Sequence, residues 1–225
     1  MTTGSAPTDT TLTDLVRRWE RGWSACRGWA TPQEAGGGLH LLQHRPGRYR
    51  EILALHDDPA VVRALADEAA ADGKATWLTV PTTDPDNVER VLRDAGLHVK
   101  RTREWLMTRA LADHPRRAVP DQYRTTAGGT GVVRVEVLHS SGEPAASGQA
   151  AITGEDAVLD RIETVPTHRR RGLGSVVVAT LAAAAVTRGA RHGILVASPD
   201  GQALYATLGW TAASAVVIAT NQPDG

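Results

Sequence analysis

Residues 164–175 read TVPTHRRRGLGS, and an apolar, alanine-rich segment follows them at once. The apolar stretch before them, Ala157–Val165, predicts a strand, and Gly172–Arg188 predicts a helix. The first turn of a helix leaves backbone N–H groups without partners and carries the positive end of the helix dipole. Glycines at 172 and 174 let the backbone approach a ligand closely, and three arginines add full charges. The stretch therefore predicts an anion-binding site between a strand and a helix.

Two nucleotide-binding loops use the same physics, and neither fits this stretch. A Walker loop requires a lysine followed by Ser or Thr after its last glycine, and no lysine follows Gly174. The dinucleotide fingerprint requires a third glycine, and Val177 stands in that place. A nucleotide-binding protein is therefore the weakest of the hypotheses considered below.

Strands and helices alternate around this stretch, which predicts a mixed α/β sheet. A hairpin precedes it, and a strand, a short helix and a last strand follow it. The expected elements after the linker are strands 132–139, 145–152 and 157–165, helix 172–188, strand 193–197, helix 201–208 and strand 213–219.

The first half of the chain predicts a similar order. An amphipathic helix over Thr13–Trp29 has its tryptophans at helical spacing, which is more typical of a core than of a substrate wall. The further expected elements are strands 39–43 and 49–56, helix 60–71, strand 76–80, helix 86–94 and strand 99–108. We expect a flexible tail at 1–12, an N-terminal region at 13–111, a linker at 112–120 and a second domain at 121–225.

Apolar and glycine positions of residues 60–97 recur in the same order at 175–210, which indicates an ancient duplication. Where the second copy carries Arg169–Gly174, the first carries Asp57-Asp58-Pro59. Two carboxylates and a proline oppose anion binding, because they add negative charge and remove one amide donor. The sequence therefore predicts one anion site per chain.

Composition restricts the other classes of function. The chain has 25 basic and 25 acidic residues, so no broad basic face for nucleic acid is indicated. A single cysteine excludes an intrachain disulfide framework, and the scattered histidines indicate no metal site. No apolar run reaches the length of a membrane span and the N-terminus lacks a signal-peptide pattern, so we expect a cytoplasmic protein.

Two motifs together resemble those of the GNAT superfamily of N-acyltransferases. The first is Pro166-x-x-Arg169-x-x-Gly172-x-Gly174, and the second is LYATLGW at residues 204–210. The resemblance covers about residues 131–220, and the first half is similar to a degenerate copy of the same fold. It implies a GNAT-like α+β mixed sheet with the C-terminal copy complete at the CoA site. It also implies acetyl-CoA or a related acyl-CoA as co-substrate, no metal, and direct acyl transfer to an amine.

The resemblance also implies which residues hold the co-substrate. Loop amides would bind the pyrophosphate of CoA, and the strand end before the loop would pair with the pantetheine arm. Ser198 stands where the family often has an Asn that contacts this arm. The implied CoA-binding residues are Ile162, Glu163, Thr164, Arg169, Arg170, Arg171, Gly172, Leu173, Gly174, Ser175 and Ser198.

Catalytic candidates follow from the same resemblance. Tyr205 stands where the family has the hydroxyl that protonates the departing thiolate, and a phenol carries that proton at neutral pH. Glu163 and Asp160 are alternative bases for the amine proton, with water or another group also open. With regular alternation the two carboxylates lie on opposite faces of the strand. His168 is expected to cap or pack beside the arginines.

The acceptor is open at this stage. We expect a small-molecule or peptide amine, with no nucleic-acid or membrane partner, and a homodimer is left open. A catalytically silent CoA-binding or protein-interaction module on the same fold is the alternative function, because the first half shows such decay.

Overall fold

The strand, loop and helix around residues 164–175 form as the sequence predicts. A computed structural model describes residues 11–223, so the tail expected at 1–12 lies almost entirely outside the described residues. The elements of the C-terminal half are β7 (Tyr123–Gly128), β8 (Val132–His139), β9 (Pro144–Thr153), β10 (Asp156–Thr164), η1 (Pro166–His168), α4 (Leu173–Thr187), β11 (His192–Ala197), α5 (Pro199–Thr207) and β12 (Thr211–Thr220).

The N-terminal half also follows the expected order. α1 begins at a Thr11 cap, and α2 and α3 each have a proline at their start, where a missing N–H costs nothing. Its elements are α1 (Leu12–Arg27), β1 (Gln33–Ala35), β2 (Gly38–Arg45), β3 (Arg48–Ala54), α2 (Pro59–Ala71), β4 (Thr76–Thr82), α3 (Pro85–Asp94), β5 (His98–Val99) and β6 (Glu104–Ala110).

All strands of the described chain join in one sheet. Its order is β1-β2-β3-β4-β12-β6-β11-β10-β9-β8-β7, with β5 paired to β12 off this path. β3 and β4 are parallel, as are β10 and β11, whereas the other pairs are antiparallel. Outward from the centre, β12 to β1 and β6 to β8 show the same order of antiparallel and parallel pairs, and the second arm ends with one more strand, β7.

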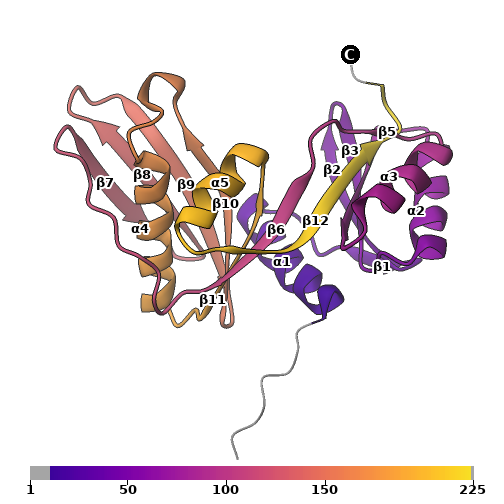
Figure 1. The fold of residues 1–225 in the computed structure, drawn as a ribbon, viewed down its shortest axis with the longest axis horizontal. Coiled ribbons are helices and arrows are strands. Elements are labelled where there is room, and N and C mark those ends of the chain that lie inside the picture. The colour runs from indigo at the N-terminus through magenta and orange to yellow at the C-terminus, as the bar shows by residue number, and fades with distance from the viewer. Residues whose placement is uncertain (1–10, 224–225) are drawn as a thin grey trace, which may run out of the picture.

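The two halves exchange their last strands at the centre of the sheet (Figure 1). β6, the last strand of the first half, pairs with β11 of the second half, and β12 pairs with β4 of the first. β6 and β12 also pair with each other, with a register shift between Ala212 and Ser214. Residues of β6 are thus part of the first half of the sequence but lie beside β11 of the second half in the sheet.

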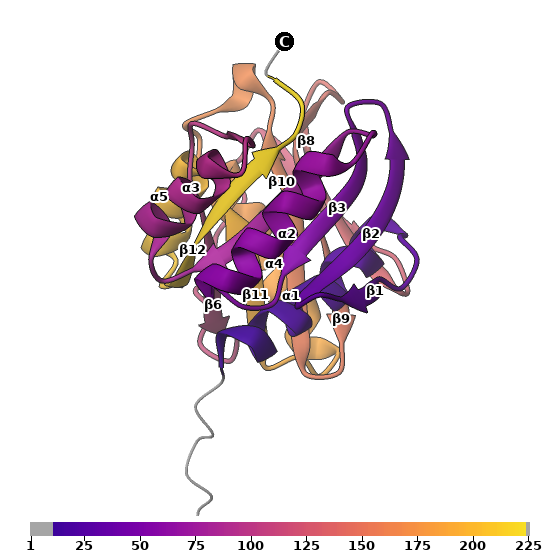
Figure 2. The same cartoon turned by 90° about the vertical axis from the view of Figure 1, so that its right-hand side faces the viewer.

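The helices divide between the two faces of the sheet. Ala197 on β11 pairs with Trp105 on β6, which pairs with Ala215 on β12, so these residues share a face. Ala197 lies in the core with α4 and α5, and Val217, two residues after Ala215, lies in the core with α2 and α3. Those four helices therefore cover one face, and Figure 2 looks onto α2 and α3 there. α1 packs on the opposite face, against β9 and β10.

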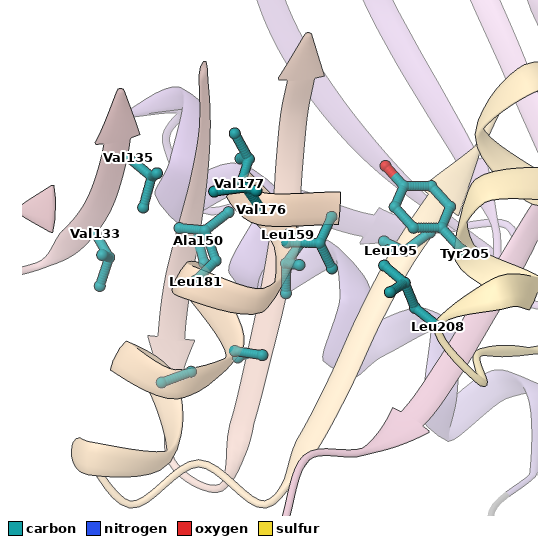
Figure 3. Close-up of a cluster of buried hydrophobic side chains, with 14 of the residues drawn as sticks. Val133, Val135, Ala150, Leu159, Val176, Val177, Leu181, Leu195, Tyr205 and Leu208 are labelled. Atoms are coloured by element: carbon teal, nitrogen blue, oxygen red, sulfur yellow. The ribbon is translucent and has the colours of Figure 1, made fainter. Parts of the chain in front are cut away.

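The buried side chains under α4 hold the second half together. Figure 3 shows Val177 and Leu181 of α4 facing Val133, Val135 and Ala150 of the sheet. All five are at most 1% exposed. Because burying one such side chain stabilises the fold by roughly 1.5–3 kcal/mol, this contact holds α4 against the sheet. Among the described residues no helix is long and apolar enough to cross a membrane.

One expected strand was wrong, and two observed strands were not expected. The strand expected over 99–108 is broken between β5 and β6, where Arg103 contacts Glu89 (2.6 Å) and Asp86 on α3. β7 was not among the expected strands, and its mostly polar, exposed residues are those of an edge strand. The short strand β1 was not expected either.

Candidate active site

The loop before α4 has the backbone geometry of an anion site. Arg170 and Gly172 have φ angles of 63° and 78°, and Gly172 is the N-cap of α4 without any side-chain capping bond. Successive N–H groups in such mixed conformations turn toward one side. The free amides of the first helical turn, at Leu173, Gly174 and Ser175, add to the same positive potential. Space around Gly172 is open, because a Cβ there would meet nothing within 4 Å.

The three arginines of the loop point in different directions. Arg169 donates from Nε to the carbonyl oxygen of Thr164 at 3.3 Å, which braces the loop against the end of β10. Arg170 lines the cleft described below. Arg171 turns to the other side of the loop and donates to the Tyr123 hydroxyl at 3.0 Å.

His168 belongs to that other side and packs, as expected. It is 8% exposed, and its Nδ1 lies 3.0 Å from the same Tyr123 hydroxyl. The side chain holds the loop to β7 and does not reach the cleft.

β10 separates from β11 at the level of the loop. The two strands pair only over Asp156, Ala157 and Val158. Beyond Val158 the edge of β10 that faces β11 is unpaired up to Thr164 in the described structure. Backbone N–H and C=O groups there are available to a ligand that enters between the strands.

A β-bulge in β10 changes the direction of its carboxylates. Asp160 pairs with Gln149 of β9 and Glu163 with Ser147, so three steps on β10 match two on β9. Arg161 within the bulge has a φ of 53°. Because paired residues share a face, Asp160 and Glu163 both face the side covered by α1. The expectation that they lie on opposite faces, which assumed regular alternation, is wrong.

The two carboxylates have different surroundings. Asp160 forms a bidentate ion pair with Arg27 of α1, at 2.6 and 2.7 Å, and accepts from Gln149 at 3.0 Å. Its side chain is 10% exposed. Glu163 is exposed, and no hydrogen bond or ion pair to the described residues engages its carboxylate. Glu163 is therefore free to accept a proton, whereas the oxygens of Asp160 are occupied.

Tyr205 lies on α5, across the gap between β10 and β11. The residue is 6% exposed, and its ring lies 6.0 Å from that of Trp210. Figure 3 shows its oxygen pointing away from Leu195 and Leu208. Burial, and secondarily the negative charge of Asp160, raise the pKa of the phenol above its usual range. The hydroxyl therefore keeps its proton well above neutral pH.

Ser198 caps α5 at the mouth of the same gap. Its hydroxyl accepts from the N–H of Gly201 at 3.3 Å. This cap uses one lone pair of the oxygen and leaves its O–H proton as a donor toward the cleft that Ser198 lines.

One cleft of about 1460 Å³ joins these features. Most of the candidate residues line it, whereas Arg171 and Ser175 do not. The candidates on its wall are Asp160, Ile162, Glu163, Thr164, Arg169, Arg170, Gly172, Leu173, Gly174, Ser198 and Tyr205.

The cleft continues onto residues that the motifs did not indicate. Trp19 and Trp23 of α1 stack at 4.9 Å and are 4% and 9% exposed, so they are core residues that also form part of the wall. Arg48 and Glu104, from β3 and β6 of the first half, line it too. Glu104 lies on the exchanged strand β6, whereas Arg48 lies on β3 within the first half, and no local sequence pattern signals that both reach the cleft.

The corresponding place in the first half is closed by its own carboxylates. Asp58 caps α2 by accepting from Ala60 at 2.9 Å and Val61 at 3.2 Å. Asp57 accepts from the Thr82 hydroxyl at 3.0 Å, which ties the loop to the end of β4. The amides that would bind an anion there already have partners.

Among residues 11–223 no group of His, Cys, Asp and Glu is arranged to hold a metal ion.

Comparison with known proteins gives a family segment and a fold. Residues 141–218 match the family model described as FR47-like protein. A search of curated proteins finds no match. A GCN5-related N-acetyltransferase from Kribbella flavida superposes with a TM-score of 0.70 at 18% identity, covering 97% of this chain and 98% of that one.

A tandem GNAT protein from the clavulanic acid biosynthesis pathway superposes with a TM-score of 0.62 at 16% identity, covering 99% of this chain and 98% of that one. A third structure, a GCN5-related N-acetyltransferase from Sphaerobacter thermophilus, gives 0.62 at 11% identity over 84% and 78% of the two chains. At these identities the likeness establishes the fold.

Proposed function

The chain has the GNAT fold, and we propose that it is an acyl-CoA-dependent N-acyltransferase, with acetyl-CoA as the first co-substrate to test. One observation carries the proposal: an anion-binding loop, a separated strand pair and a proton-bearing tyrosine open into a single cleft. A phosphate-bearing arm that ends in a thioester fits this order of groups.

Residues of the loop would hold the phosphates. The N–H groups of residues 170–175 donate hydrogen bonds, and Arg170 adds a charge at the wall of the cleft. The unpaired edge of β10 would bind the arm that leads to the thioester, and its N–H groups are the donors for the thioester carbonyl. Arg171 would act indirectly, by holding the loop to Tyr123.

Tyr205 and Glu163 would move the two protons. Bound acetyl-CoA supplies an acyl group on a sulfur leaving group. Glu163 accepts the proton that the acceptor amine loses as its C–N bond forms. Tyr205 donates a proton, or a hydrogen bond, to the sulfur as the C–S bond breaks. Much of the rate enhancement comes from holding the two reactants together, which can contribute roughly 7–11 kcal/mol.

Asp160 takes a different part in this proposal. Its ion pair with Arg27 joins α1 to β10, and its negative charge contributes to the raised pKa of Tyr205. We assign it to positioning and Glu163 to proton transfer, with water as the remaining alternative base.

Calorimetry with acetyl-CoA, followed by release of free CoA thiol with a panel of amines, tests the proposal. Arg170→Glu reverses a charge at the loop and is expected to weaken CoA binding at least tenfold. Arg116→Glu makes the same change on an exposed linker residue and serves as the control. Equal affinities for the two variants would place the CoA site elsewhere. Binding without turnover on any amine would favour the catalytically silent module.

A further inference from the structure

The cleft extends from the loop across the face that α1 partly covers, onto strands of both halves. Its floor beyond β10 consists of apolar side chains from β11 and β12, namely Val196, Val216 and Ile218. The acyl acceptor must approach the thioester from this side, because α4 and α5 close the opposite face. Groups on this floor and its rim therefore meet the acceptor.

Glu104 is a carboxylate on this floor. It belongs to β6, pairs with Val216 and lies two residues from Leu106, which packs with α1. It is half-buried, and no hydrogen bond or ion pair to the described residues engages its carboxylate. Burial raises the pKa of Glu104, and the charge of Arg48 only partly opposes this effect.

Arg48 does not neutralise Glu104 directly. Its guanidinium donates to Glu51 at 2.5 and 2.6 Å, and Glu51 is fully buried and also accepts from Thr79 at 2.6 Å. Arg48 is thus held by Glu51, and no hydrogen bond or ion pair joins it to Glu104. Glu104 is left with a half-buried negative charge, which a cationic ligand would stabilise.

Glu104 and Glu163 face the same side of the sheet, separated by β11. Val196 of β11 pairs with Leu106, two residues from Glu104 on the same face, so Val196 is part of the floor on the strand between β10 and β6. Two strand spacings place β10 and β6 roughly 10 Å apart before the separation of β10 widens the gap. A chain of methylene groups with a nitrogen at each end matches this arrangement.

We propose that the acceptor is an aliphatic diamine or polyamine, whose second ammonium group binds Glu104 while the reacting amine lies at Glu163. The proposal rests on the proposed acyl transfer and adds to it the class of acceptor. The first half of the chain then has a defined part in the site, because its exchanged strand supplies the residue that selects the acceptor.

Diamines of increasing length test the proposal, from 1,3-diaminopropane to 1,10-diaminodecane, against monoamines of equal length. The wild-type chain is expected to bind the diamines more tightly, measured by calorimetry without CoA, with an optimum at intermediate length. In turnover with acetyl-CoA, Glu104→Gln is expected to raise the KM for the best diamine at least tenfold, with kcat within threefold. The KM for the matched monoamine should stay unchanged.

Glu136→Gln provides the matched control. Glu136 is an exposed carboxylate on β8 that lines the same cleft, on the far side of Glu163. General attraction of cations would make the two variants equal, and would overturn the proposal. So would a wild-type chain that binds no diamine at millimolar concentration, or shows no preference for two charges.

The binding assays separate this proposal from the proposed function. A chain that binds CoA but discriminates no diamine loses the acceptor assignment alone. Diamine binding that depends on Glu104, without any CoA binding, overturns the acyl transfer and leaves the cation site.

Discussion

Gly172→Ala is the sharpest perturbation of the loop, because it changes backbone conformation without a steric clash. Gly172 has a φ of 78°, and a Cβ added there would meet nothing within 4 Å. An alanine in this conformation costs about 1–2 kcal/mol. If the residue relaxes to negative φ, the neighbouring amide turns away from the anion. Losing one hydrogen bond to a charged group costs about 1.5–3 kcal/mol, which is roughly a 10- to 150-fold loss of CoA affinity.

Gly189→Ala supplies the matched control at the other end of α4. Gly189 has a φ of 91° and equally open surroundings, but it lies outside the cleft. Urea unfolding should show similar losses of stability for both variants. Calorimetry with acetyl-CoA should show a loss of affinity for Gly172→Ala alone. If the two variants bind CoA equally, the loop does not hold the phosphates and the reasoning fails.

Three further predictions concern the cleft. Tyr205→Phe should lower kcat roughly 100-fold and leave the Kd of CoA unchanged; an unchanged kcat in a thiol-release assay would remove Tyr205 from the reaction. Arg27→Ala leaves the Asp160 carboxylate unpaired and should cost about 2–3 kcal/mol in urea unfolding, and a double variant with Asp160→Asn should recover part of it. Burial raises the pKa of Glu104, because the folded protein disfavours the charged carboxylate. The contribution of Glu104 to the free energy of unfolding is therefore most favourable below pH 4.5, where the carboxyl is protonated, and is lost as the pH rises. Glu104→Gln should therefore raise Tm at pH 7 and not at pH 4; an equal Tm change at both would exclude this cause.

The local chemistry of the site could be predicted from the sequence. Glycines, arginines and a following apolar helix determine the loop at 164–175 through backbone geometry, which depends on neighbours in the chain. Tyr205 stands within a motif whose spacing the resemblance supplied. Both signals are local, and the structure places Gly172 and Tyr205 on the wall of one cleft.

The direction of the carboxylates and the composition of the acceptor side could not be predicted. A single bulge at Arg161 brings Asp160 and Glu163 to one face, and the local sequence Asp-Arg-Ile-Glu contains no pattern that predicts a bulge. The ion pair from Arg27 to Asp160 joins residues 133 positions apart. Glu104 reaches the cleft through the exchange of β6 and β12, which is a property of sheet topology.

A crystal structure of the chain with CoA tests the central claim most directly. The pyrophosphate is expected within hydrogen-bond distance of the amides of residues 170–175, with the pantetheine arm along the free edge of β10 and the sulfur beside the Tyr205 hydroxyl. CoA bound outside this cleft, or with its sulfur turned away from Tyr205, would contradict the account.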